Sequence, residues 1–287
     1  MKYIDLHTHS YFSDGTMSPT NLVKYASSKG LSAIALTDHD TIDGLKEGQQ
    51  AAYKHGNINF INGIEISVMF QQDIQNKFLN REFHILGLGL KDYSVLKNTI
   101  EELQQNRERR NLQLIESFNY IGIDITYDMV LKTAVSKNIS RVHFAKLLIT
   151  MGYAKSIDEV FINFFRGDIV TNTSKKCLLP KQTIDIIRKC GGVSVLAHPF
   201  RYGLTESEIT QLILLLKGYG LNGAEAMYSS HTKKQEEFII KISSELGINI
   251  CGGSDFHGNM KKGLDIGVGY GNLRIPHQLW EDLRGYK

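Results

Sequence analysis

Cysteine is scarce in this 287-residue sequence, and the three that occur, Cys177, Cys190 and Cys251, show no short paired spacing. An odd, widely spaced set argues against a disulfide framework and favours a reducing compartment. Long apolar runs are lacking too, since the run 213–216 ends at Lys217, far short of the roughly 20 residues that span a bilayer. The N-terminus meets a charge too early for a signal peptide. We therefore expect a cytoplasmic protein with no membrane partner.

An excess of charge of one sign is also lacking, because 33 Lys and Arg oppose 30 Asp and Glu, for a net charge of +3. This excess is too small to indicate a nucleic-acid scaffold, although it leaves a local basic groove open. The sequence has no internal repeat, no low-complexity stretch and no Gly-x-Ser-x-Gly nucleophile elbow. Nothing in it indicates an obligate protein partner. The remaining composition, 42% hydrophobic and 22% charged, is typical of a globular protein with a large core.

Short apolar segments alternate with helical ones along much of the chain. We expect strands at 3–6, 33–36, 59–65, 81–90, 193–196, 223–227 and 248–251. The intervening helices carry end signals, such as Ser18-Pro19 at the start of one and Gly30 after its end. This alternation is typical of parallel strands with right-handed crossovers. Seven strands predict an α/β barrel, closed or distorted, with its site at the carboxyl ends of the strands.

The alternation stops between about Ser94 and Lys176, where the pattern is helical throughout. The segment 101–120 is amphipathic, and Ser140 and Ser156 are positioned to cap two further helices. We predict a barrel whose first part is 1–97, a helical insertion at 98–176 that caps the substrate side, and a second barrel part at 177–287.

Polar residues cluster at the predicted strand ends. His7-Thr8-His9 begins the series, and because residues two apart on a strand point to one side, both imidazoles can face one metal ion. The other members are Asp14, His39, Glu65, His84, His198, Asp255 and His257. Each alone has a structural explanation, such as a turn residue or a buried core histidine. Together they deliver imidazoles and carboxylates from six strand ends to one mouth of the barrel, which predicts a metal site.

Imidazole with carboxylate, and without thiolate, suits Zn²⁺, Mn²⁺ or Fe²⁺. Nine ligands exceed what one ion takes, so we expect two or three divalent ions with one bridging carboxylate. Sites with several ions are characteristic of phosphatases and nucleases, in which the ions bind phosphate oxygens and lower the pKa of a bound water to about 7.

These residues resemble the motifs of the PHP (polymerase and histidinol phosphatase) family. The similar segments are 5–10 with 13–15, then 36–40, 63–65 and 253–258. The resemblance covers nearly the whole chain and implies a distorted (β/α)7 barrel with up to three metal ions. It assigns His7, His9, Glu65 and Asp255 to the first ion, Glu65, His84 and His198 to the second, and Asp14, His39 and His257 to the third.

Within the family the chain is most similar to the tryptophan-operon-associated branch, whose members carry a helical insertion. They are described as nucleoside 3′,5′-bisphosphate phosphatases and as 5′→3′ exonucleases on short RNAs. The segment 140–145 resembles their Arg-Pro-His stretch, with Val142 in place of the proline, and 228–231 resembles a second branch motif in weakened form. The resemblance implies a phosphorylated small molecule, a nucleotide or a short RNA as substrate.

The insertion supplies cations for such a substrate. Arg141 and His143 lie at a predicted helix N-terminus, which favours phosphate, and Arg matches phosphate with a bidentate fork. Arg107 and Arg110 fit either phosphate binding or a solvated helix face, and Arg201 follows a strand end closely enough to reach the metal face. The candidate catalytic residues are Glu65, as the bridging carboxylate, and His231, as a proton donor to the leaving oxygen.

Two other functions compete with a nucleotide phosphoesterase. A phosphatase for a small ester of the histidinol phosphate type would use the same metals, but the insertion counts against it. A metal-stabilised accessory module without turnover would not need a complete set of metal ligands. The complete set in this chain counts against that function.

Overall fold

The computed structural model describes residues 2–71, 78–79, 81–135, 138–165 and 177–285. Seven strands form one sheet in chain order, β1 to β7, which confirms the predicted distorted barrel. The strands are β1 (Ile4–Asp5), β2 (Ala33–Leu36), β3 (Asn59–Met69), β4 (Glu82–Leu88), β5 (Val193–Leu196), β6 (Gly223–Tyr228) and β7 (Asn249–Gly253). The first and last strands come together because Leu6 N donates to Gly252 O at 3.3 Å and Asp255 N donates to His7 O at 2.9 Å.

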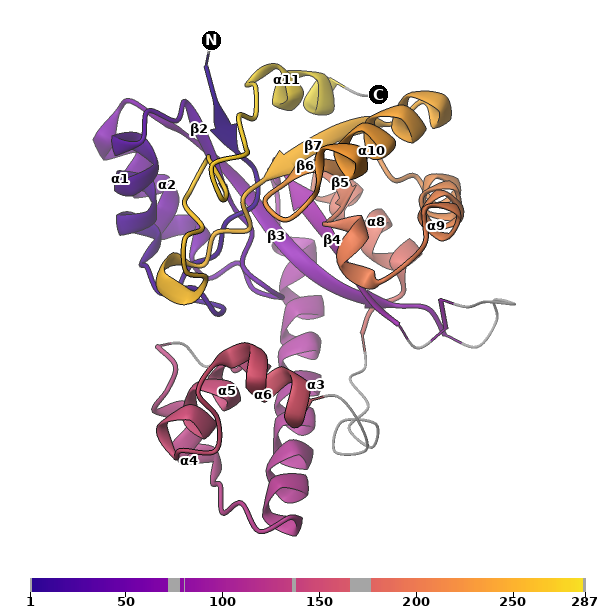
Figure 1. Cartoon of the computed structure of the whole chain (residues 1–287). Coiled ribbons are helices and arrows are strands. Elements are labelled where there is room, and N and C mark those ends of the chain that lie inside the picture. Colours follow the sequence, from indigo (N-terminus) through magenta and orange to yellow (C-terminus); the bar gives the residue numbers. More distant parts are fainter. Residues whose placement is uncertain (1, 72–77, 80, 136–137, 166–176, 286–287) are drawn as a thin grey trace.

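The helices cover the outside of this barrel (Figure 1). They are α1 (Pro19–Ser28), α2 (Leu45–His55), α8 (Pro180–Lys189), α9 (Glu206–Gly218), α10 (Lys233–Leu246) and α11 (Gln278–Gly285). Their ends follow the predicted signals: Ser18 accepts from Asn21 N at the start of α1, and Gly247 ends α10 with a left-handed φ of 62°. Among the described residues, no helix has both the length and the apolar composition needed to cross a membrane.

The prediction that all seven strands are parallel is wrong for β4. This strand pairs antiparallel with both neighbours, β3 and β5, whereas the other pairs are parallel. A parallel neighbour needs a crossover connection, usually a helix, and the sequence predicts no helix between the third and fourth strands. Because β4 is reversed, its beginning, and not its end, lies at the mouth where the other strands end.

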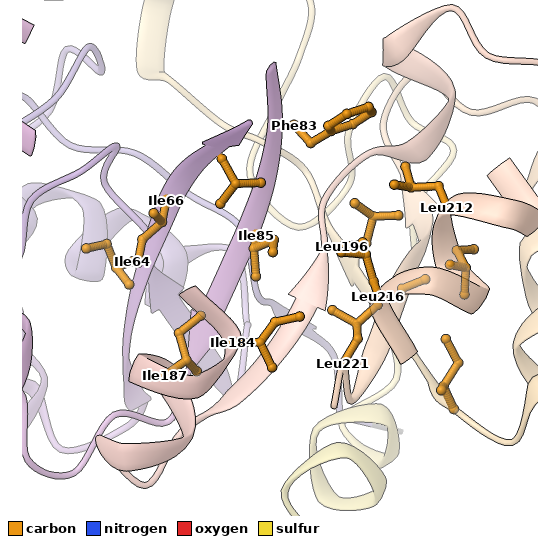
Figure 2. Close-up of a cluster of buried hydrophobic side chains, with 14 of the residues drawn as sticks. Ile64, Ile66, Phe83, Ile85, Ile184, Ile187, Leu196, Leu212, Leu216 and Leu221 are labelled. Atoms are coloured by element: carbon orange, nitrogen blue, oxygen red, sulfur yellow. The ribbon is translucent and has the colours of Figure 1, made fainter. Parts of the chain in front are cut away.

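Strand side chains alternate between two hydrophobic clusters. Ile64, Ile66 and Ile85 join an outer cluster, where they pack against Ile184 and Ile187 of α8 (Figure 2). The side chains in between join an inner cluster, to which β3 and β4 contribute Ile61, Leu86 and Leu88. Both clusters are almost fully buried. The alternation directs Glu65 and His84 to the same side as the inner cluster, which is the interior of the barrel.

The insertion is attached to the barrel through one long helix, α3 (Ser94–Tyr120), which begins seven residues before the predicted amphipathic segment. Its first half, with Leu96, Ile100 and Leu103, belongs to the outer cluster of the barrel. Its second half, with Leu114 and Phe118, belongs to a separate cluster formed with α4 (Tyr127–Leu131), α5 (Arg141–Thr150) and α6 (Ile157–Asn163). Figure 1 shows these three helices gathered around the far half of α3. The predicted end of the insertion at 176 lies outside the described residues.

Candidate metal centre and substrate cavity

Glu65 lies at the centre of the mouth of the barrel and is fully buried. Five imidazoles surround its carboxylate. The distances from Oε2 are 3.3 Å to His7 Nε2, 3.3 Å to His9 Nε2 and 2.9 Å to His39 Nδ1, and those from Oε1 are 2.8 Å to His84 Nδ1 and 2.9 Å to His198 Nε2. Burial alone would raise the pKa of Glu65, but the neighbouring imidazoles hold it well below its usual range. The two oxygens of one ionised carboxylate therefore face two separate groups of nitrogen atoms.

The other predicted ligands lie beside this group. Asp255 Oδ1 is 3.3 Å from His9 Nε2. Asp14 Oδ1 is 3.2 Å from His257 Nε2, and Asp14 Oδ2 is 3.8 Å from His39 Nε2. All nine predicted ligands thus converge. They form four overlapping groups whose ligand atoms lie within 4.8 Å of one another: His9, Asp14, His39 and His257; His7, His9 and Asp255; His7, Glu65 and His198; His39, Glu65 and His84.

Three non-glycine residues at this mouth adopt left-handed backbone conformations. Asp40 has a φ of 50°, His198 of 30° and Asp255 of 56°. Each follows the end of a strand, where the chain turns sharply. A non-glycine residue in this region costs on the order of 1–2 kcal/mol, and such strain gathers at functional sites. The strained turns therefore mark this mouth independently of the ligand residues.

A buried carboxylate on β6 supports two predicted ligands, and sequence reasoning missed it. Glu225 Oε1 is 3.1 Å from His7 Nδ1, and Glu225 Oε2 accepts from His198 N at 2.7 Å. A carboxylate that holds the second nitrogen of a metal-binding histidine fixes the orientation of its ring. The signal was present, because Glu225 lies in an apolar strand, as Glu65 does.

Two other polar groups that the prediction missed hold Asp255. Lys261 Nζ donates to Asp255 Oδ2 at 2.6 Å, and Tyr228 Oη donates to the same oxygen at 2.7 Å. A further missed carboxylate, Asp38, accepts from Ser10 N at 2.7 Å and from Ser13 Oγ at 2.7 Å, which fixes the loop after His9. These contacts leave Asp255 Oδ1 directed towards the imidazoles.

The donor set fits divalent metal ions. The buried atoms of the cluster without a hydrogen-bond partner among the described residues include His7 Nε2, His9 Nε2, Asp14 Oδ1 and Glu65 Oε2. Leaving buried polar atoms unpaired is costly, and a cation would satisfy them. Two ligand atoms that are each about 2.1 Å from one ion lie about 3–4 Å apart, which matches the 3.2–3.8 Å separations between the carboxylates of Asp14 and Asp255 and their neighbouring imidazoles.

A cavity of about 380 Å³ opens above this cluster, between the barrel and the insertion. Arg201 and Lys261 line it from the barrel, whereas Arg107, Arg110 and Arg141 line it from the insertion. The Nε atoms of these last three arginines are buried without a hydrogen-bond partner among the described residues. Burial and the nearby charges of Arg107 and Arg141 lower the pKa of Arg110 to about 9. The cavity therefore has a wall of imidazole and carboxylate opposite a wall of guanidinium.

His143, a predicted substrate-binding residue, and His231, the predicted proton donor, do not line this cavity. His143 caps α5, because its Nδ1 accepts from Ser140 N at 2.9 Å, and burial lowers the pKa of its imidazole to about 4. His231 donates from Nδ1 to Ala226 O at 2.9 Å, and burial lowers its pKa as well. The single N–H of a neutral imidazole is thus used by Ala226 O in His231. The geometry does not support a substrate-binding role for His143 or a proton-donor role for His231.

Comparison with known proteins agrees with the resemblance. The sequence profile described as PHP domain matches residues 5–185. A 5′-3′ exoribonuclease of Haemophilus influenzae is 31% identical over 89% of this chain and 90% of that protein. A 3′,5′-nucleoside bisphosphate phosphatase of Chromobacterium violaceum is 30% identical over 99% of this chain and 97% of that protein. A solved structure of an amidohydrolase from Chromobacterium violaceum, with bound sulfate and no metal, superposes with a TM-score of 0.85 at 30% identity, covering 99% of this chain and 96% of that one. The chain belongs to the PHP domain family.

Proposed function

We propose that this protein is a metal-dependent phosphoesterase that hydrolyses phosphate esters of nucleotides. The observation that carries the proposal is the pairing of two opposite walls in one cavity: a carboxylate surrounded by five imidazoles, and the guanidinium groups of Arg110 and Arg141, whose Nε atoms are buried. The first suits cations and the second suits phosphate, and a phosphate ester bound to metal ions needs both. The hydrolase names of the two relatives agree with this reaction.

The proposed ligand sets follow the two oxygens of Glu65. Oε2, with His7, His9 and Asp255, would hold one ion, and Oε1, with His84 and His198, a second. Asp14, His39 and His257 would hold a third. When bound, Mn²⁺, Zn²⁺ or Fe²⁺ would polarise the phosphate and supply hydroxide at neutral pH. Glu65 would then be the bridging carboxylate, and Glu225 would hold the ring of His7 and the backbone of His198 in place.

The proposed role of the insertion, 98–176, is to cap the substrate. Arg110 and Arg141 of the insertion, with Arg201 of the barrel, would bind phosphate oxygens that do not react, because guanidinium matches phosphate in shape and charge. The relatives act on a nucleoside 3′,5′-bisphosphate and on RNA by their names, so we propose that the substrate is a nucleoside bisphosphate or the 5′ end of a short RNA.

A direct assay tests this function. The protein is stripped with a chelator, dialysed and reloaded separately with Mn²⁺, Zn²⁺ or Fe²⁺. Each form is incubated with adenosine 3′,5′-bisphosphate, a short 5′-phosphorylated RNA or histidinol phosphate, and released phosphate and nucleotides are measured. We expect metal-dependent turnover of at least one nucleotide substrate and much slower release from histidinol phosphate. Metal binding without turnover of any substrate would contradict the proposal and favour an accessory module.

A further inference from the structure

The turn after β2 is held by groups from the insertion as well as from the barrel. Arg107 Nη2, on α3, forms an ion pair with Asp40 Oδ2, and Asn138 Nδ2 donates to His39 O at 2.6 Å. From the barrel, Ser67 N donates to Asp40 Oδ1 at 3.0 Å. His39 and Asp40 of the barrel are therefore fixed by two side chains of the insertion, which are 31 residues apart in the sequence.

The ion pair is buried, because the side chains of Arg107 and Asp40 are 7% and 1% exposed. Removing one partner of a buried pair leaves an uncompensated charge, which is strongly unfavourable. Asp40 also has the left-handed φ of 50°, a conformation that persists only where surrounding contacts enforce it. The insertion supplies part of that enforcement.

The residue held in this way next to Asp40 is the predicted ligand His39. Its Nδ1 is 2.9 Å from Glu65 Oε2 and its Nε2 is 3.8 Å from Asp14 Oδ2. The ring thus lies between the carboxylates of Glu65 and Asp14. Its side chain is 17% exposed, whereas those of His7 and His9 are 0% exposed. Packing around the ring therefore constrains His39 less than His7 and His9, and its position depends more on its backbone.

We propose that Arg107 and Asn138 are positioning residues that connect the insertion to His39, so that docking of the insertion and binding of the third metal ion, proposed for Asp14, His39 and His257, stabilise each other. Coupling of this kind is reciprocal, since whatever strengthens metal binding when the insertion is docked must equally strengthen docking when the metal is bound. The inference rests on the proposed metal site. In this proposal Arg107 holds the turn that carries His39 and does not bind phosphate.

Arg110 provides a matched control. It lies on the same helix, lines the same cavity and is also buried. Its Nη2 donates to Asn111 Oδ1 at 2.8 Å, within α3 itself. The substitutions Arg107→Gln and Arg110→Gln therefore remove the same charge from neighbouring places, but only the first removes a bond to the turn that carries His39.

The first test is titration of the metal-free variants with Mn²⁺, with bound metal measured after equilibrium dialysis. We expect Arg107→Gln and Asn138→Ala to lower the affinity for the most weakly bound ion by about 10- to 100-fold, as loss of an outer-shell partner does. Arg110→Gln should leave Mn²⁺ affinity unchanged and raise KM. If Arg107→Gln behaves as Arg110→Gln does, the inference is wrong and Arg107 binds substrate. If the unaltered protein binds no metal, it is the proposed function that fails.

The second test measures the reciprocal effect by amide hydrogen exchange in α5, with and without Mn²⁺. Bound Mn²⁺ should slow exchange there in the unaltered protein and in Arg110→Gln, but not in Arg107→Gln. If Arg107→Gln does not fold, Asn138→Ala carries both tests, because it keeps the buried ion pair. Exchange in α5 of the unaltered protein that is indifferent to Mn²⁺ would overturn the coupling.

Discussion

The two walls of the cavity differ in how their polar groups are held before any ligand binds. On the barrel wall, supporting partners orient the predicted ligands, as Glu225 does for His7 and Lys261 does for Asp255. On the insertion wall, the buried Nε atoms of Arg110 and Arg141 have no hydrogen-bond partner in the described part of the chain, and the pKa of Arg110 is lowered to about 9. The difference teaches that the barrel is organised to hold cations, whereas the insertion is organised to receive an anion. Variants on the two walls should therefore fail in different ways.

The largest effect is expected from Glu65→Gln. The substitution removes the charge between five imidazoles, so both metal content and kcat should fall by more than the roughly 10- to 100-fold that loss of an outer-shell partner costs. Metal analysis of the purified variant checks this, with Glu281→Gln on α11 as a control for the same chemical change far from the site. Full activity in Glu65→Gln would contradict the bridging assignment.

A smaller effect on the same wall is expected from Glu225→Gln. The variant can still hydrogen-bond His7 but no longer holds it with a charge, so Mn²⁺ affinity should fall by about 10-fold or more, measured by titration of the metal-free protein. At saturating Mn²⁺ most of the activity should return. A loss of kcat that added metal does not restore would mean that Glu225 acts on the substrate directly.

On the opposite wall, Arg141→Ala should raise KM for adenosine 3′,5′-bisphosphate while metal content stays constant. A charge-assisted hydrogen bond contributes about 1.5–3 kcal/mol, which corresponds to about a 10- to 100-fold change. Steady-state kinetics measure this, with the exposed Arg109→Ala as the matched control. Loss of metal from Arg141→Ala would show that the two walls are not chemically separate.

The smallest catalytic effect is expected from His231→Gln. The imidazole lies outside the cavity lining and packs against Phe200 and Tyr228, so we expect a loss of stability on the order of 1 kcal/mol from the altered hydrogen bond to Ala226 and little change in kcat. Thermal unfolding and a pH–rate profile measure the two quantities. A fall in kcat of about 10²-fold with loss of the alkaline limb would restore His231 as a general acid.

Much of the site was predictable from the sequence because its residues follow strand ends, which local patterns reveal. His7 and Glu65 are examples, and the structure brings them to 3.3 Å of each other. The reversed direction of β4 was not predicted, because the order of apolar and helical segments along the sequence does not determine the direction of each strand. Glu225 was missed because its supporting role depends on contacts with two residues, His7 and His198, that are distant from it in the sequence. The capping contact of His143 was not predicted, because a helix N-terminus that can bind phosphate can also be closed by its own side chains, as it is here.

The long helix α3 has a consequence for how this family member can vary. Its first half is fixed to the barrel through Leu103 and its second half carries the insertion through Leu114. Each residue added between them would turn the whole insertion by about 100° about the helix axis and lift it by about 1.5 Å. Seven residues added between Arg110 and Leu114 would restore the direction to within about 20°, but would raise Arg141 by about 10 Å. The height of Arg141 over the metal-binding wall therefore depends on the number of residues in a single helix.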